Sequence, residues 1–266
     1  MKQQIIPFQN KKLAVYSNDN AAKPAIVFIH GNSMSAKIWQ KQFDDAALNA
    51  NHHLLAFDLP GCGNSDNLDT YSLSLMADSI TAVIAHFNLK DYVLAGNSLG
   101  GDLILQLTDK LNHCKGVVIL NTPPVSKPPA MEKALLPNPL VGMFFTKEYD
   151  KANVQPLAEV MFTDVKNIPD FVALDFERTD GNMRQALAEA VGAGNYNDEV
   201  LALGNTKIAV MLISGQDEKL VNNTYFETLQ VPMLFKGHVH YVPHAAHCPQ
   251  WENAGSFNKL VSDFCK

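Results

Sequence analysis

The chain has 266 residues, enough for one large domain or two small ones, and its 47% hydrophobic content supports a substantial buried core. A formal net charge of -6, with no basic run, excludes the electrostatic footprint of a nucleic-acid binder. No apolar run approaches membrane-spanning length, and the N-terminus lacks the apolar core and cleavage site of a secretory signal. We therefore expect a soluble, cytoplasmic protein with no membrane partner.

The first half of the chain predicts strands that alternate with helices. Two apolar-rich pieces within residues 3–17 are typical of an antiparallel hairpin at a sheet edge. Continuous apolar runs, suited to strands buried on both faces, follow at residues 25–29, 53–59, 92–95 and 115–121. The segments between them predict helices at residues 39–48, 72–87 and 103–111. This alternation predicts a largely parallel sheet that is covered on both faces.

The alternation stops at Thr122, where a proline-rich segment with short helical stretches begins and continues to about residue 203. We predict that residues 123–203 form a small cap inserted over a core made of residues 1–122 and 204–266. Most of the large apolar residues in the insertion would form its own core. A subset is expected to line a substrate pocket, and we assign Met143, Phe144 and Phe162 to it.

Regular structure resumes after the insertion. An apolar run at residues 207–213 predicts a strand that ends in a polar loop, and a helix near 223–229 and a strand near 238–242 follow. The last helix carries its apolar residues on one face. The sequence has no internal repeat.

The strand at residues 92–95 leads directly into Gly96-Asn97-Ser98-Leu99-Gly100, the Gly-x-Ser-x-Gly pattern of a nucleophile elbow. Such a turn between strand and helix is so sharp that the positions flanking the serine have no room for side chains. Ser98 would then project above the sheet edge at the positive end of a helix. The context of strand before and helix after makes Ser98 the candidate nucleophile.

A serine hydroxyl needs a base at neutral pH, and that base needs an acid to orient it. On this architecture the three groups follow the order serine, acid, histidine, each after a strand. The loop after the strand at 207–213 offers two adjacent acids, Asp217 and Glu218. Among nine histidines, His247 is preferred because it follows the last strand and precedes the final helix.

The oxyanion formed during attack requires two N–H donors. One is expected to be the backbone N–H of Leu99, immediately after the nucleophile. The second should come from the loop His30-Gly31-Asn32-Ser33, and we assign it to the N–H of Asn32.

Metal and nucleotide sites are the alternatives to this interpretation. His238-Val239-His240 and the spacing from His244 to His247 resemble metal-ligand patterns. Metallo-hydrolases usually follow a paired His-x-His closely with Asp-His, whereas Tyr241-Val242-Pro243 follows here. No phosphate-binding glycine motif is present. We therefore predict no metal and no organic cofactor.

With these residues identified, the whole sequence resembles the α/β-hydrolase superfamily, and several stretches are most similar to the AidH-type N-acylhomoserine lactonases. The matching stretches are His30-Gly31-Asn32-Ser33-x-Ser35, Asp58-Leu59-Pro60-Gly61-x-Gly63-x-Ser65, Ser98-Leu99-Gly100-Gly101, Thr122-Pro123-Pro124-Val125 and Arg178-Thr179-Asp180-Gly181. The last two of these stretches are the more specific ones. In contrast, Gln250-Trp251-Glu252 with Phe257-Asn258-x-Leu260-Val261 is similar to the tail of carbon-carbon bond hydrolases that act on ring-cleavage products. Residues 126–176 align poorly with either group.

The resemblance implies an α/β-hydrolase fold with a small helical cap. It also favours Glu218 as the acid, three positions after Gly215, with Asp217 as second choice. The implied activity is hydrolysis of a small acyl ester or lactone by a serine hydrolase, with N-acylhomoserine lactones as the leading substrates. The alternatives are a general carboxylesterase, a carbon-carbon bond hydrolase and, in a different class, a non-catalytic ligand receptor on the same fold.

Overall fold

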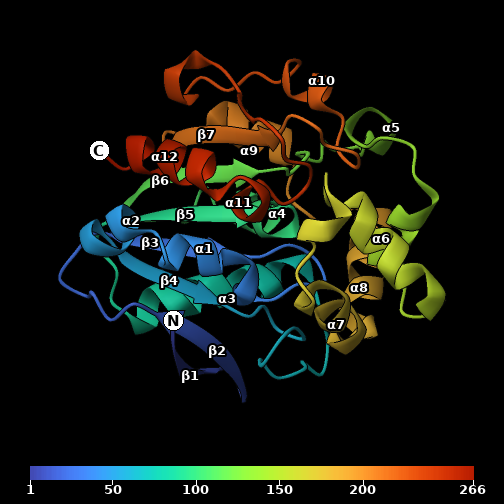
Figure 1. Cartoon of the computed structure of the whole chain (residues 1–266), viewed down its shortest axis with the longest axis horizontal. Coiled ribbons are helices and arrows are strands. Elements are labelled where there is room, and N and C mark those ends of the chain that lie inside the picture. Colours follow the sequence, from blue (N-terminus) through green and yellow to red (C-terminus); the bar gives the residue numbers. More distant parts are fainter.

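The computed structural model describes residues 1–266 and contains one eight-stranded sheet with the strand order β1-β2-β4-β3-β5-β6-β7-β8 (Figure 1). Strands β1 (Lys2–Phe8) and β2 (Lys11–Ser17) form an antiparallel hairpin at one edge, and β2 also pairs antiparallel with β4 (His53–Phe57). All other neighbouring strands are parallel. The prediction of an edge hairpin joined to a largely parallel sheet is confirmed.

The remaining strands lie close to the apolar runs that predicted them. They are β3 (Ala25–Ile29), β5 (Tyr92–Asn97), β6 (Cys114–Leu120), β7 (Ala209–Gly215) and β8 (His240–Val242). Every residue of β3, β4 and β5 is buried. Strands covered on both faces cannot alternate between apolar and polar residues, which explains their continuous apolar sequences.

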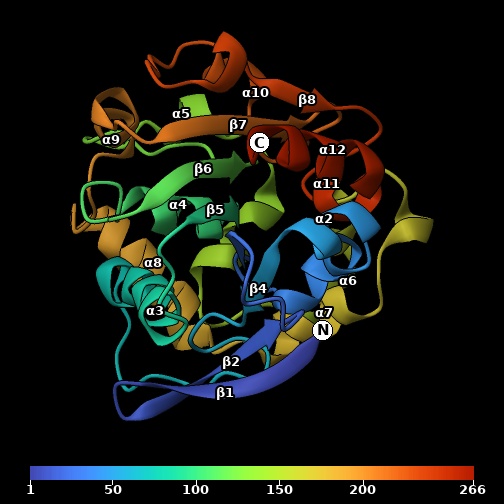
Figure 2. The same ribbon diagram turned by 90° about the vertical axis from the view of Figure 1, so that its left-hand side faces the viewer.

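Helices cover both faces of the sheet (Figure 2). One face carries α3 (Leu73–His86), α4 (Leu99–Leu105) and α9 (Glu199–Asn205); the other carries η1 (Ala36–Trp39), α1 (Gln40–Phe43), α2 (Ala46–Asn51), α11 (Pro249–Glu252) and α12 (Ala254–Phe264). The core is correspondingly two hydrophobic clusters. On β3, Val27 and Ile29 belong to one cluster and Ile26 and Phe28 to the other, as the two-residue period of a strand requires.

Three expected helices have different bounds. The helix predicted at 39–48 is broken into η1, α1 and α2, because the side chain of Asp45 caps a new helix by accepting a hydrogen bond from Leu48 N at 2.9 Å. The helix predicted at 103–111 begins earlier, at Leu99, because the chain enters it directly from Ser98. Beyond β7, α10 (Asn223–Phe226) is shorter than expected, and η5 (Phe235–Gly237) precedes β8.

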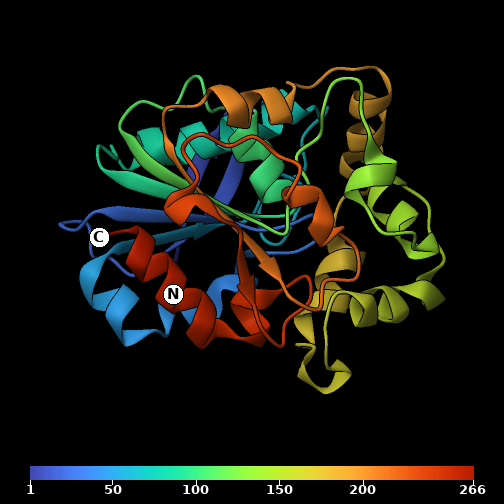
Figure 3. The same cartoon turned by 90° about the horizontal axis from the view of Figure 1, so that it is seen from above.

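The segment between β6 and β7 contains helices and no strand. Besides α9 it has α5 (Met131–Ala134), η2 (Pro139–Phe145), η3 (Lys151–Asn153), α6 (Val154–Val160), η4 (Val165–Asn167), α7 (Phe171–Arg178) and α8 (Gly181–Gly192). Figures 1 and 3 show α6, α7 and α8 together on the side where the parallel strands end. A cap over the sheet is expected at this position, and the boundaries at residues 123 and 203 stay a prediction. None of the helices combines the length and the apolar composition needed to cross a bilayer.

Candidate active site

Ser98 lies at the turn between β5 and α4, and its backbone is in a strained conformation with φ of 52° and ψ of -123°. A positive φ at a residue with a side chain costs about 1–3 kcal/mol and persists only where the surroundings enforce it. Here Ser98 N donates to Leu120 O at 2.8 Å, and Thr122 Oγ1 donates to Ser98 O at 2.9 Å. Both partners belong to the adjacent strand β6 or its exit, so the sheet itself holds the turn.

The two glycines of the elbow allow the backbone to pass this closely. A Cβ on Gly100 would lie 2.3 Å from Ile29 O, and a Cβ on Gly96 would lie 2.4 Å from the carbonyl carbon of Gly100. Neither neighbour is a flexible side chain that could move aside. The strand, serine and helix therefore have the arrangement that the Gly-x-Ser-x-Gly pattern predicts.

His247 and Glu218 are brought together from two loops at the same end of the sheet. His247 Nδ1 lies 2.8 Å from Glu218 Oε2, and both residues are buried. The other carboxylate oxygen, Oε1, accepts from the backbone N of Lys219 at 2.9 Å and of Leu220 at 2.8 Å. Asp217, the neighbouring candidate, is exposed and makes no hydrogen bond to the histidine. The geometry thus pairs the histidine with Glu218.

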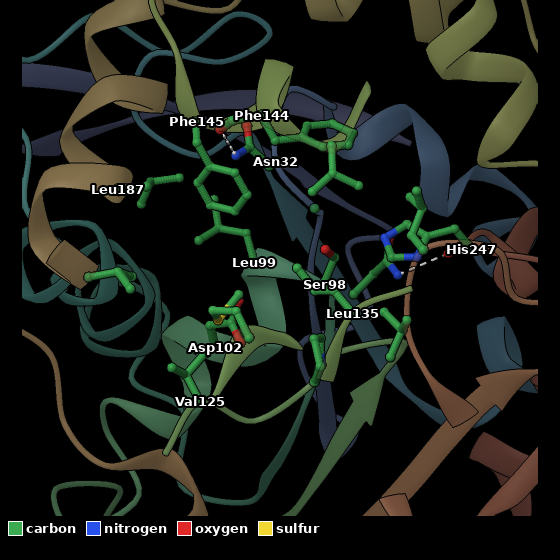
Figure 4. Close-up of a pocket in the computed structure, with 18 of the residues that line it drawn as sticks. Asn32, Ser98, Leu99, Asp102, Val125, Leu135, Phe144, Phe145, Leu187 and His247 are labelled. Atoms are coloured by element: carbon green, nitrogen blue, oxygen red, sulfur yellow. Dashed lines mark hydrogen bonds between the residues drawn. The ribbon is translucent and has the colours of Figure 1, made fainter. Parts of the chain in front are cut away.

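Ser98 and His247 line the same pocket, and Figure 4 shows both side chains at its edge. The backbone of His247 is fixed on two sides, since Asn97 Nδ2 donates to His247 O at 3.2 Å and His247 N donates to Met161 O at 3.0 Å. No hydrogen bond joins the Ser98 hydroxyl to the imidazole in this structure. Such contacts are often long in ligand-free sites and shorten when substrate binds.

The two residues expected to supply the oxyanion donors line the same pocket as Ser98. Leu99 is the first residue of α4, and the first N–H groups of a helix have no partner within it. The backbone N–H of Asn32 donates no hydrogen bond within the chain. The side chain of Asn32 is held in place, because its Nδ2 donates to Phe144 O at 2.8 Å and its Oδ1 accepts from Ser33 Oγ at 2.9 Å. The loop is therefore tied to the segment between β6 and β7.

His30 supports this loop from beneath and does not line the pocket. It is fully buried, and its Nε2 accepts from Leu59 N at 2.9 Å. The remaining ring proton therefore sits on Nδ1, which donates to Gly31 O at 2.8 Å. Burial lowers the pKa of His30, so the neutral ring is favoured.

The pocket above Ser98 is lined mainly by hydrophobic side chains, and Phe144 is one of them. Met143 and Phe162, which we expected to line it, do not. Both are buried in the hydrophobic cluster on one face of the sheet, with Phe162 completely enclosed. Phe145, two residues after Met143, and Met161, one residue before Phe162, line the pocket instead.

Two acidic residues in the pocket wall, Asp102 and Glu199, were not anticipated from the sequence. Glu199 accepts hydrogen bonds from Gln106 Nε2 and from Val125 N, both at 2.8 Å. Burial raises the pKa of Glu199 well above its ordinary value and raises that of Asp102 to about 7. Asp102 stands one turn after Ser98 in α4, and that spacing was the available signal.

In the sequence, Glu199 has the position of an ordinary acidic residue at the start of a helix. It follows Asp198, which caps α9 by accepting from Leu201 N at 2.9 Å, and acidic residues are common in the first turn of a helix. No group of three or more His, Cys, Asp or Glu side chains in the structure is arranged to hold a metal ion.

Comparison with known proteins places this site in a family. The model of the alpha/beta hydrolase family matches residues 26–260. The chain belongs to the alpha/beta hydrolase family. Its eight-stranded, mostly parallel sheet flanked by helices has the α/β-hydrolase fold that the resemblance implied.

Curated relatives of this hydrolase match over nearly the whole chain at low identity. A 2-hydroxy-6-oxo-6-phenylhexa-2,4-dienoate hydrolase from Burkholderia cepacia is 23% identical, over 94% of this chain and 90% of the relative. A 2-hydroxy-6-oxononadienedioate/2-hydroxy-6-oxononatrienedioate hydrolase from Escherichia coli is 24% identical, over 96% and 91% of the two chains.

Among solved structures, a mutant of the N-acyl homoserine lactonase AidH complexed with N-hexanoyl homoserine lactone superposes with a TM-score of 0.93. Its identity is 23%, and the match covers 100% of this chain and 99% of that one. An enol-lactonase from Burkholderia xenovorans superposes with a TM-score of 0.80 at 19% identity, covering 98% and 99%. These likenesses establish a shared fold.

The close approach at the elbow predicts that Gly100→Ala destabilises the hydrolase by about 3 kcal/mol, because the new methyl group meets backbone atoms of Ile29 and His30. Gly255→Ala in α12 is the matched control, since nothing lies within 4 Å of its Cβ. Its free energy of unfolding should change by less than about 1 kcal/mol. Urea unfolding measures both, and equal stabilities for the two variants would contradict the packing described for the elbow.

Proposed function

We propose that the protein is a serine hydrolase that cleaves acyl esters or lactones with Ser98 as nucleophile, His247 as base and Glu218 as orienting acid. The observation that carries this proposal is the hydrogen bond of 2.8 Å between His247 Nδ1 and Glu218 Oε2, at the wall of the pocket that also contains Ser98. A histidine held through Nδ1 presents Nε2 to its surroundings, which is the arrangement that activates a serine.

In the proposed mechanism, His247 Nε2 takes the Ser98 proton while the serine oxygen attacks the substrate carbonyl carbon. The buried carboxylate of Glu218 stabilises the imidazolium that forms and keeps the ring in its tautomer. The carbonyl oxygen becomes an oxyanion, and the N–H groups of Leu99 and Asn32 donate to it. A preorganised donor of this kind contributes roughly 10²- to 10³-fold to turnover.

The tetrahedral intermediate then collapses. His247 returns the proton to the leaving alkoxide, which for a lactone stays attached to the acyl group. A water molecule deprotonated by the same histidine attacks the acyl-enzyme and releases Ser98. Nucleophile, base and oxyanion donors are all supplied by the chain, so we propose that the reaction needs no metal or organic cofactor.

We propose that residues 123–203 act as a cap that binds the acyl chain. Phe144, Phe145 and Met161 from this segment line the pocket and offer an apolar surface to hydrocarbon. Neither lysine nor arginine lines the pocket. An uncharged lactone or ester fits this lining better than a dienoate acid, whose carboxylate would enter without a partner.

N-acylhomoserine lactones are the leading substrates. This choice is supported by the apolar, cation-free pocket and by the likeness to AidH, which was solved with N-hexanoyl homoserine lactone. Carbon-carbon bond hydrolysis is the second candidate, because the curated relatives described above are dienoate hydrolases. A general carboxylesterase is the third.

A hydrolysis panel separates these substrate classes. We expect acylhomoserine lactones of varied chain length to be consumed faster than matched linear esters, with no consumption of dienoate acids. Chelator should leave the rates unchanged. Ser98→Ala, the control for contaminating activity, should lower turnover on the order of 10⁴-fold or more. A preference for dienoate acids would reject the lactonase assignment, and full activity of folded Ser98→Ala would reject the serine mechanism.

Substitution of each of the two adjacent acids tests which of them orients His247. Glu218→Gln removes the charge that faces His247 and should lower kcat by roughly 10²- to 10⁴-fold. Asp217→Asn changes an exposed side chain and should lower kcat less than about three-fold. Steady-state kinetics on one activated ester measures both. A larger loss for Asp217→Asn than for Glu218→Gln would overturn the assignment of the acid.

A further inference from the structure

The mechanism leaves two carboxyl groups in the pocket wall without a role, one on the buried Glu199 and one on the half-buried Asp102. Asp102 extends from α4, the helix that begins beside Ser98, and Glu199 stands at the start of α9, which packs against α4. Both side chains line the pocket that contains Ser98 and His247. In Figure 4, Asp102 lies on the side of the cavity opposite Phe144 and Phe145. Buried acids are costly unless something uses or compensates them.

The surroundings of the Asp102–Glu199 pair determine which of the two acids carries the negative charge. Both oxygens of Glu199 already accept hydrogen bonds, Oε1 from Gln106 and Oε2 from Val125. Asp102 Oδ1 is enclosed and accepts no hydrogen bond from the chain. Burial, and after it the charge of Asp102, raise the pKa of Glu199 well above its ordinary value, so above the Asp102 pKa of about 7 the pair carries one negative charge. The charge is centred on Asp102, on the side of the pocket.

We propose that the Asp102–Glu199 pair determines charge selectivity, so that the site takes esters or lactones with an uncharged acyl group and rejects those whose acyl group ends in a carboxylate. This inference rests on the proposed hydrolase function. A second negative charge entering the pocket would meet the pair in apolar surroundings, where no lysine or arginine lines the wall to offset it. Neutral chains avoid this repulsion and bury apolar surface against the same wall.

The test uses two activated esters of matched length. p-Nitrophenyl pentanoate is neutral, whereas mono-p-nitrophenyl glutarate ends in a carboxylate. The parent should show a kcat/KM for the neutral ester roughly ten-fold or more above that for the anionic one. Asp102→Asn should bring the two values within about three-fold of each other, mainly by raising kcat/KM for the glutarate ester. A damaged fold would lower both rates and could not produce that gain.

Asp198→Asn is the matched control. It removes a charge from the residue next to Glu199, asparagine still caps α9, and the side chain does not line the pocket. Its ratio should equal that of the parent. An unchanged ratio in Asp102→Asn, or a parent that does not discriminate, would overturn the inference while leaving the hydrolase intact. Hydrolysis of neither ester would instead reject the proposed function, and the inference would fall with it.

A pH series on the parent gives the same test without a variant. The other titratable groups that line the pocket with Asp102 are Glu199, His247 and Tyr196. Because the ratio compares two substrates on one enzyme, the ionisation of His247 cancels. Asp102 is neutral below its pKa of about 7, so the preference for the neutral ester should be weaker near about pH 6 than near about pH 8. A ratio that stays constant across this range would contradict the charge assignment.

Discussion

The backbone turn at Ser98 is the constraint on which the rest of the site depends. A residue with a side chain at φ of 52° is held there because strand β6 and Thr122 bind its N–H and carbonyl. The same turn starts α4 at Leu99, which orients the N–H proposed as an oxyanion donor. One strained residue thus sets the position of the nucleophile, of one oxyanion donor and of the helix that carries Asp102.

The loop proposed to supply the second donor is coupled to the segment above it. Asn32 donates to Phe144 O, and Ser33 accepts from Arg184 Nη1 at 3.2 Å. Arg184 is almost completely buried, and its guanidinium lies 4.7 Å from the centre of the Phe176 ring, so cation–π contact and backbone carbonyls replace a carboxylate partner. Movement of this segment would therefore disturb the oxyanion loop, which links substrate binding in the proposed cap to the reacting atoms.

Much of this arrangement could be predicted from the sequence because it depends on local rules. Continuous apolar runs indicate the buried strands, and the two glycines that flank Ser98 at Gly96 and Gly100 indicate the elbow. Which of two adjacent acids meets His247 is set by the loop backbone, where the N–H groups of Lys219 and Leu220 fix Glu218. The residue types of Asp217 and Glu218 do not reveal this backbone geometry.

The lining of the pocket was harder to predict for a related reason. The composition of the segment between β6 and β7 shows that it is apolar. Whether an apolar side chain enters the pocket or the core, however, differs between neighbouring residues of a short helix. Phe144 therefore lines the pocket while Met143 does not. Asp102 and Glu199 are far apart in the sequence, and only the packing of α4 on α9 brings them together. Tertiary packing, which no local sequence pattern encodes, determines both the apolar and the acidic residues that line the pocket.

The central claim is that Ser98 is a nucleophile activated by His247, and reaction with a fluorophosphonate probe tests it most directly. Intact-mass and peptide measurements should find one phosphonyl adduct, on the peptide that contains Ser98, with labelling abolished in Ser98→Ala and strongly slowed in His247→Ala. Absence of any adduct in the folded parent, as expected of a non-catalytic ligand receptor, or labelling at another serine, would contradict the account.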